Sequence, residues 1–320
     1  MTRSGTAQLI ERFVTSAGWV PQVDHVSYLA SGEYNENFLV DTGRRRLVFR
    51  INHGSQLGLD NQIEYEFAVL QAVAASGVTP RPHRCVGSCE EFPRGALLME
   101  YLPGKKLDYE VDTVSAAGVF ARIHSLPPSD KLIIQDDPIA AIIHESRRLL
   151  ERYPDHPRPT LYPRLRNYLD RMTDLADAHP DAFADESLCI VNTEVNSGNF
   201  VVDQGTARLV DWEKAVVSYR YQDLAHFLVP TTTQWKDDFV FTAQTRRGFL
   251  DAYHAAIGGA VTREQLDTRT ALLERVILLR AFSWCYMALA EYSDGRTLQD
   301  PSTLAKIELY FAEIDRYLGG

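Results

Sequence analysis

Strand-like patterns fill the first third of this chain, whereas helical patterns fill most of the remainder. Strands and helices that are segregated in this way are typical of α+β folds. Short apolar segments separated by turns such as Ser31-Gly32 predict an antiparallel sheet, and an apolar stripe at helical spacing predicts a helix over residues 60–76. The predicted strands are Val26–Leu29, Phe38–Val40, Leu47–Ile51, Arg84–Gly87 and Ala96–Tyr101.

The helical part is interrupted once, by three short apolar runs between residues 188 and 211. Two of these runs flank Asp203-Gln204-Gly205, a turn signal, so we expect a β-hairpin inserted among helices. Leu102-Pro103-Gly104 breaks the pattern earlier, which predicts a small lobe at residues 1–102 and a larger, mainly helical lobe at residues 103–320. Long helices are expected at 239–256, 263–293 and 302–318.

The composition, 45% hydrophobic and 24% charged over 320 residues, is that of a soluble globular protein. No apolar stretch approaches the ~18 to 20 residues of a membrane helix, and Glu11 and Arg12 lie where a signal peptide would be apolar, so we expect a cytoplasmic protein that makes no membrane contact. The four cysteines form no CxxC pair and the histidines no HExxH, which predicts reduced, packed thiols without a zinc site. A net charge of −10 argues against a nucleic-acid partner.

The inserted hairpin carries the residues that suggest chemistry. Its entry loop contains Glu194 and, five residues on, Asn199, and its second strand ends at Asp211. A base that orients a hydroxyl, together with oxygen ligands for magnesium, is the set that phosphoryl transfer needs. Asn-rich turns and strand-end aspartates are also common in ordinary loops, so the pattern alone leaves both interpretations open. The chain has no P-loop, Rossmann or GxSxG motif.

Several segments, taken in order, resemble the aminoglycoside phosphotransferase and choline kinase-like family, a branch of the protein-kinase fold. The entry loop, Asn192-Thr193-Glu194 through Gly198-Asn199, is similar to the family's HGDxxxGN loop. Val210-Asp211-Trp212-Glu213-Lys214-Ala215 is similar to its I-D-W-E-x-A segment, and Gln222-Asp223-Leu224-Ala225 to its Y-D-L-A, whose aspartate braces the catalytic loop. The similar segments upstream are Leu97–Gly104, which looks like the hinge that meets the adenine, and Phe120–Leu126.

The resemblance implies a two-lobed kinase that moves the γ-phosphate of ATP or GTP to a hydroxyl of a small molecule, such as an aminoglycoside or other antibiotic, a choline-like amino alcohol or a sugar. It assigns Glu194 as the base, and Asn199 and Asp211 as ligands of Mg²⁺. Arg50 stands where the fold has a phosphate-binding lysine, with Glu66 as its partner and Glu64 as the alternative. The nucleotide-binding candidates are Ser31, Gly32, Asn35, Asn37, Arg50, Glu66, Met99, Glu100 and Tyr101.

Two positions depart from the family's pattern. Glu194 replaces the loop aspartate, and Asn192 replaces the histidine before it. Both metal-ligand positions are kept, which favours an active enzyme. The alternative is a nucleotide-binding pseudokinase with a regulatory or binding role.

The acceptor-binding candidates lie in the last helices, where relatives build the acceptor pocket. Residues 105–320 carry 32 acidic and 24 basic side chains, which favours a cationic acceptor; the alternative is an acidic surface that serves solubility. Trp284 and Tyr286, in an apolar run, also fit a packed core. We expect a monomer or a homodimer. The candidates are Trp235, Asp237, Asp238, Trp284, Glu291 and Tyr292.

Overall fold

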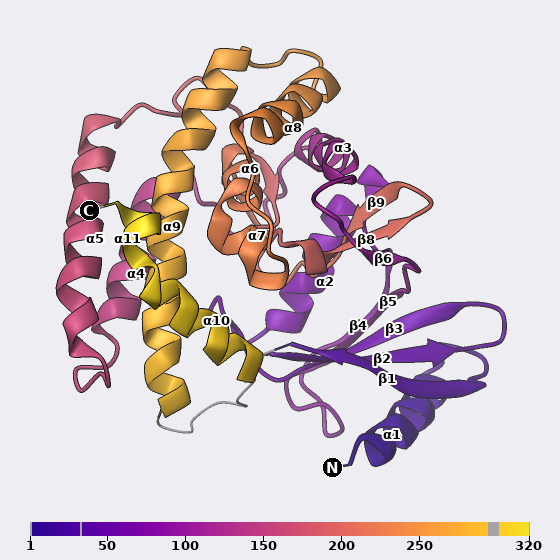
Figure 1. Ribbon diagram of the computed structural model, residues 1–320. Helices are drawn as coiled ribbons and strands as arrows, with labels where there is room; N and C mark the ends of the chain where they lie inside the picture. Colours follow the sequence, from indigo (N-terminus) through magenta and orange to yellow (C-terminus); the bar gives the residue numbers. More distant parts are fainter. Residues whose placement is uncertain (1, 33, 294–300, 320) are drawn as a thin grey trace. The chain divides into compact units, whose positions relative to one another are not determined.

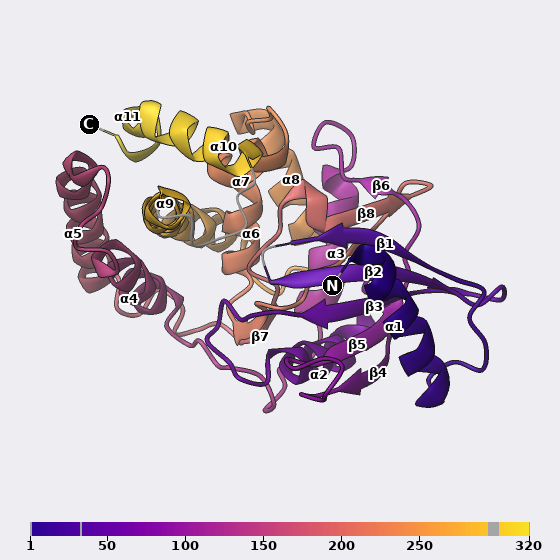
Figure 2. The same ribbon diagram turned by 90° about the horizontal axis from the view of Figure 1, so that it is seen from below.

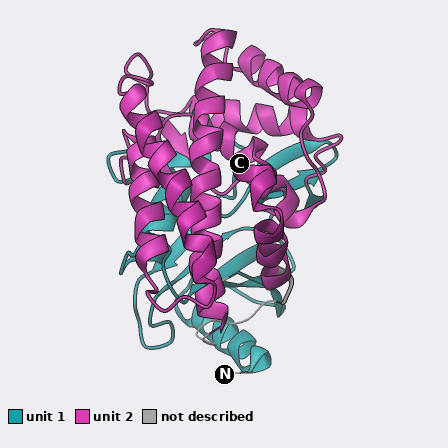
Figure 3. Ribbon diagram, turned by 60° about the vertical axis from the view of Figure 1, so that its left-hand side comes forward, with its two compact units in different colours: residues 1–106, 129–132, 199–215 teal, residues 107–128, 133–198, 216–320 magenta. Residues whose placement is uncertain are grey.

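The computed structural model describes residues 2–32, 34–293 and 301–319 and confirms the α+β class. The chain divides into two compact units (Figure 3). Unit 1 contains residues 1–106, 129–132 and 199–215, and unit 2 contains residues 107–128, 133–198 and 216–320. The strand pair that the sequence places among helices therefore groups with unit 1.

Unit 1 is built on a five-stranded antiparallel sheet with the strand order β1-β2-β3-β5-β4 (Figure 1). The predicted sheet is confirmed. Helix α2 (Gln62–Val73) corresponds to the predicted helix, and α1 (Arg3–Ser16) is a second helix, which begins where the Thr2 hydroxyl accepts a hydrogen bond from the Gly5 N–H. The strands are β1 (His25–Ser31), β2 (Asn35–Asp41), β3 (Arg46–Asn52), β4 (Pro82–Val86) and β5 (Ala96–Glu100).

Phe49 of β3 lies at the centre of the apolar core of unit 1. Its ring centroid is 5.2 Å from that of Phe92, 5.9 Å from that of Trp19 and 6.3 Å from that of Phe13 on α1. Offset and edge-on ring pairs of this kind add to the stabilisation that burial provides.

We expect Phe49→Ala to lower the free energy of unfolding by about 3–5 kcal/mol, because the cavity left by the ring cannot collapse fully. Urea unfolding followed by fluorescence or circular dichroism measures the change. The control is Leu29→Ala in β1, where the side chain is exposed and the expected loss is below about 1 kcal/mol. Similar losses in the two variants would contradict the central role of Phe49.

The predicted hairpin is formed by β8 (Phe200–Asp203) and β9 (Thr206–Leu209), and β6 (Lys105–Lys106) pairs with β8. Gln204 and Gly205 both have positive φ, as the tight turn of a hairpin requires. Gly104 has a φ of 148°, and a Cβ there would lie 2.6 Å from the Val202 carbonyl oxygen. Only glycine fits where the chain passes so close to β8.

Unit 2 is mainly helical and is organised around α9 (Arg263–Ser293), which contacts α4, α5 and α6 (Figures 1 and 2). The expected helix at 302–318 is two helices, because the chain leaves helical geometry at Glu313. A short antiparallel pair joins β7 (Cys189–Val191) to β10 (Val216–Ser218). The other helices are α3 (Thr113–His124), α4 (Pro138–Glu151), α5 (Tyr162–Ala178), α6 (Tyr221–Leu228), α7 (Pro230–Lys236), α8 (Ala243–Ala256), α10 (Pro301–Ala312) and α11 (Ile314–Leu318).

The four cysteines are free; Cys189 and Cys285 are buried, whereas Cys85 and Cys89 are half-buried. Across the described ranges, no helix has both the length and the apolar character that a membrane span requires.

Candidate active site

Arg50 of β3 forms the centre of a buried ion-pair network in unit 1. Its Nη1 donates to Glu66 Oε1 at 2.5 Å and to Asp211 Oδ1 at 2.8 Å, while its Nε donates to Asn37 Oδ1 at 2.9 Å. The structure therefore pairs Arg50 with Glu66, which is buried on α2, whereas Glu64 is exposed. Asn37 lies directly opposite Arg50 in the β2–β3 ladder, so strand register supplies this contact.

The charges of this network set the ionisation of Arg50. Burial alone would lower the pKa of its guanidinium, but Glu66, Asp211 and Glu213 outweigh that effect and raise the pKa above its usual value. Burial raises the pKa of Glu66, and the charge of Arg50 opposes this rise. Arg50 is thus a fixed cation, and a guanidinium suits the oxygens of a phosphate.

Asp211 and Asn199 lie at the same end of the β8–β9 hairpin. The Asn199 carbonyl accepts a hydrogen bond from the Val210 N–H at 2.8 Å, which brings the two ends of the hairpin together. The Asp211 side chain is 30% exposed and its backbone φ is 63°, an uncommon value for a residue other than glycine. Trp212, fully buried, anchors the segment by donating its indole N–H to the Leu209 carbonyl at 3.1 Å.

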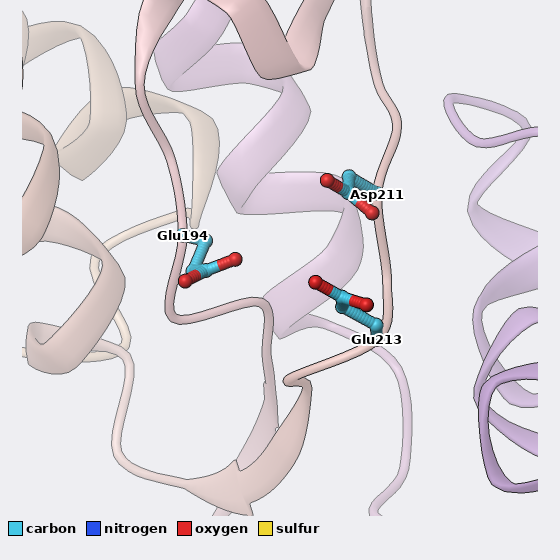
Figure 4. A group of neighbouring side chains, drawn as sticks. All are labelled: Glu194, Asp211 and Glu213. Atoms are coloured by element: carbon cyan, nitrogen blue, oxygen red, sulfur yellow. The ribbon is translucent and has the colours of Figure 1, made fainter. Parts of the chain in front are cut away.

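Glu213 is another oxygen-bearing residue of this segment, and its role was not predicted from the sequence. Its carboxylate and that of Asp211 extend to the same side (Figure 4). Asn35 donates to Glu213 Oε2, and Gln56 donates to Glu213 Oε1 at 3.3 Å. The carboxylates of Asp211 and Glu213 are oxygen donors of the kind that a hard cation such as Mg²⁺ prefers, and Asn199 lies at the same end of the hairpin.

β1 ends at Ser31, the loop after it begins at Gly32, and β2 begins at Asn35. Ser31 and Gly32 are exposed, and the Ser31 hydroxyl accepts a hydrogen bond from Tyr28 at 2.8 Å. Asn35 is buried between Glu213, to which it donates, and Asn52, whose Nδ2 donates to Asn35 Oδ1 at 2.9 Å. Asn35 thus connects this loop to the segment after β9.

Met99, Glu100 and Tyr101 form the end of β5 and the first residue after it. Met99 is buried and pairs with Val48 and Pro82 in the sheet. The Glu100 N–H donates to the Arg81 carbonyl at 2.9 Å, and the Tyr101 N–H to the Arg46 carbonyl at 3.4 Å. Because the Tyr101 contact is longer, the hydrogen bond of the Tyr101 N–H is weaker than that of the Glu100 N–H.

In unit 2, Asp223 of α6 holds the loop that carries Glu194. The buried Asp223 carboxylate accepts hydrogen bonds from the backbone N–H groups of Asn192 at 2.9 Å and Thr193 at 2.8 Å. The Asn192 side chain accepts from the Glu194 N–H at 3.0 Å. Thr193 has a φ of 67°, so the loop is fixed in a costly conformation just before Glu194, which is half-buried (Figure 4).

His124 of α3 extends the hydrogen bonding of Asp223. Its Nε2 lies 3.2 Å from Asp223 Oδ2, and its Nδ1 lies 2.8 Å from the Tyr253 hydroxyl. Burial lowers the pKa of His124, although the hydrogen bond to Asp223 opposes this effect. A neutral ring that donates to Asp223 and accepts from Tyr253 satisfies both contacts.

The lowered pKa of His124 predicts a loss of stability in acid. Below the ordinary pKa of 6.5 the unfolded chain takes up a proton that folded His124 does not, so the free energy of unfolding falls as the pH drops from 6.5 towards the folded-state pKa. Between pH 7.5 and 5.5 we expect the free energy of unfolding to fall more steeply with falling pH in the parent than in His124→Gln. The two slopes, measured by urea unfolding, should differ by up to about 1.4 kcal/mol per pH unit. His179→Gln, at an exposed position of unit 2, is the control. Parallel pH profiles for the parent and His124→Gln would contradict the expectation.

The acceptor-binding candidates of unit 2 fall into two groups. Trp235 of α7 and Trp284 of α9 are half-buried, with ring centroids 5.7 Å apart and an edge-on geometry, so the structure brings these two together. Tyr292 is buried, and Tyr286 is packed in the core, stacked on His156.

The acidic candidates already have partners. Glu291 accepts a hydrogen bond from Tyr153 at 2.6 Å and forms an ion pair with Arg152 at 3.3 Å. Asp237 accepts a hydrogen bond from Ser197 at 2.5 Å. The Asp238 side chain is 98% exposed, and its carboxylate lies 3.9 Å from the ammonium of Lys306. These acids do not form one anionic cluster.

The small antiparallel sheet, the mainly helical unit and the paired arginine and aspartate define a protein-kinase-like small-molecule kinase. Residues 25–268 match the sequence profile of the phosphotransferase enzyme family. The chain therefore belongs to this family. No curated protein sequence matches the chain significantly.

Solved structures of small-molecule kinases are similar to the chain. A choline/ethanolamine kinase family protein from Mesorhizobium loti is 14% identical, with a TM-score of 0.64 over 98% of this chain and 95% of that one. The GDP complex of an aminoglycoside 2′-phosphotransferase IIIa mutant is 15% identical, with a TM-score of 0.65 over 98% and 99%. Spectinomycin phosphotransferase, in complex with ADP and spectinomycin, is 10% identical, with a TM-score of 0.60 over 97% and 94%. At these identities the likeness shows the fold.

Proposed function

We propose that this enzyme transfers the γ-phosphate of ATP or GTP to a hydroxyl group of a small molecule. The observation that carries the proposal is the contact between Arg50 and Asp211 in unit 1, a cation suited to phosphate beside a carboxylate suited to Mg²⁺. A nucleotide with its bound metal needs both kinds of group at one place.

The residues of unit 1 would hold the nucleotide in three ways. Arg50, kept in place by Glu66 and Asn37, would bind phosphate oxygens. Asn199 and Asp211 would hold Mg²⁺, which when bound neutralises charge on the phosphates. The purine would lie beside Met99, Glu100 and Tyr101, and the phosphates beside the loop of Ser31, Gly32 and Asn35.

Glu194 of unit 2 would orient the acceptor hydroxyl and take up its proton. Glutamate is one methylene longer than the aspartate of related loops, and a displacement of about 1 Å can cost ~100-fold in rate. Two features support Glu194 as a functional base. Asp223 fixes the backbone of the loop just before Glu194. The transition state of phosphoryl transfer is loose, so the base mainly orients the hydroxyl and tolerates a modest displacement.

The proposal extends to the identity of the nucleotide donor and of the acceptor. Two of the similar structures hold different nucleotides, GDP and ADP, so both ATP and GTP are donors to test. These two proteins are an aminoglycoside 2′-phosphotransferase and a spectinomycin phosphotransferase, and the third belongs to the choline/ethanolamine kinase family. We therefore propose a hydroxylated small molecule of these kinds as the acceptor.

The experiment combines the purified protein, Mg²⁺ and either ATP or GTP with a panel of aminoglycosides, spectinomycin, choline, ethanolamine and sugars. Mass spectrometry that detects the gain of one phosphoryl group on a panel member supports the proposal. Nucleotide binding without transfer to any acceptor would favour the pseudokinase instead.

A further inference from the structure

We propose that Asp237 is a positioning residue that fixes the second half of the catalytic loop through Ser197, and that it is not a ligand for a cationic acceptor. The inference rests on the proposed function, because it concerns the loop that carries Glu194. It assigns Asp237 a role different from the one expected from the sequence.

Ser197 is completely buried and is held from two sides within unit 2. Its hydroxyl donates to Asp237 Oδ2 at 2.5 Å, and its carbonyl accepts from the Leu107 N–H at 3.2 Å. A hydrogen bond to an ionised carboxylate is stronger than one between neutral groups. Ser197 is therefore a fixed point of the loop.

The loop thus has an anchor on each side of Glu194. Asp223 holds the backbone of Asn192 and Thr193 before it, and Asp237 holds Ser197 three residues after it. When the backbone is fixed on both sides of Glu194, this side chain loses less conformational entropy on binding the substrate. Loss of the second anchor would leave the loop held at one end only.

The surroundings of Asp237 favour a structural contact over a cation site. Tyr109, buried in unit 2, stacks on Phe239, with ring centroids 5.3 Å apart. Burial raises the pKa of Tyr109, and the charge of Asp237 adds to this rise. Asp237 itself is half-buried, and its hydrogen-bond partner Ser197 is fully buried, so their hydrogen bond is stronger than it would be in water.

Asp238 provides a matched control for hydrogen exchange. It has the same charge as Asp237 and follows it in the chain, but its side chain is 98% exposed and its carboxylate lies 3.9 Å from the ammonium of Lys306. A change at Asp238 removes the same charge without touching the Ser197 contact.

The test compares Asp237→Ala, Asp237→Asn and Asp174→Ala, a change at an exposed acid of α5, in steady-state transfer to any acceptor that the parent phosphorylates. We expect Asp237→Ala to lower kcat by about 10- to 100-fold with nucleotide affinity unchanged. The amide oxygen of Asp237→Asn still accepts from Ser197, so this variant should recover most of the lost kcat. Asp174→Ala should stay within about twofold of the parent, because this exposed acid lies outside the candidate site.

A cation subsite predicts a different pattern. Asp237→Asn and Asp237→Ala would then both raise the KM of a cationic acceptor and leave kcat unchanged, and this result would overturn the proposal. Unchanged kcat and KM in Asp237→Ala would also overturn it. In a double-mutant cycle, Ser197→Ala should add little to the effect of Asp237→Ala. Fully additive losses would also overturn it.

Hydrogen exchange of the 192–198 backbone separates this inference from the proposed function, because it needs no turnover. We expect faster exchange in Asp237→Ala than in Asp238→Ala or the parent. If the parent transfers phosphate to nothing, the proposed function fails while the exchange rates still test the anchor. Equal exchange in Asp237→Ala and Asp238→Ala would overturn the anchor itself.

Discussion

Asp211→Asn is expected to weaken the binding of a magnesium-bound nucleotide by about 10- to 100-fold, because it removes an anionic oxygen from a cation that prefers carboxylates. Asp211 is partly exposed at the open end of the β8–β9 hairpin and faces Arg50 at 2.8 Å. Calorimetric titration with Mg²⁺ and a non-hydrolysable triphosphate measures the change. Without Mg²⁺ the variant should bind the triphosphate no more weakly than the parent, because a carboxylate that repels phosphate is gone.

Asp203→Asn is the matched control for this prediction. Asp203 is a half-buried carboxylate at the other end of the same hairpin, beside the Gln204-Gly205 turn. It should leave the affinity for the magnesium-bound nucleotide unchanged. Equal affinity of Asp211→Asn and the parent would remove Asp211 from the metal site.

Local patterns were sufficient to predict the five-stranded sheet, helix α2 and the hairpin of unit 1, but not α1 or β6. Alternating apolar residues and turn signals predicted the sheet and the hairpin, since both depend on neighbours in sequence. The same kind of reasoning could have separated Glu66 from Glu64. Glu66 follows Ile63 by three residues and precedes Leu70 by four, so it lies on the apolar face of α2, where both of those side chains are buried.

Contacts between distant residues were not predictable from one sequence. Glu213 is fixed by Asn35, 178 residues away, and no local pattern relates the two. The acidic excess of residues 105–320 led to the expectation of a cationic acceptor. A charge count cannot show pairing, and in the structure Glu291 is neutralised by Arg152 while Asp237 is bound by Ser197.

The base assignment leads to the largest expected effect. We expect Glu194→Gln to lower kcat by about 10²- to 10⁴-fold while the nucleotide affinity stays within a few-fold, because the carboxylate orients the acceptor hydroxyl and takes its proton but does not hold the nucleotide. Glu264→Gln, at an exposed position at the start of α9, is the matched control and should not change kcat. Steady-state transfer and nucleotide titration on the same preparations separate the two quantities.

The variant Glu194→Asp tests whether the geometry of the loop requires the longer glutamate side chain at position 194. Asp223 fixes the backbone before Glu194, so the loop cannot easily advance to compensate for a lost methylene. We therefore expect Glu194→Asp to lower kcat, with a loss on the order of 10- to 100-fold for a displacement near 1 Å. A gain in kcat would mean instead that glutamate is the misplaced base in this loop, and unchanged turnover in Glu194→Gln would show that a different group orients the acceptor.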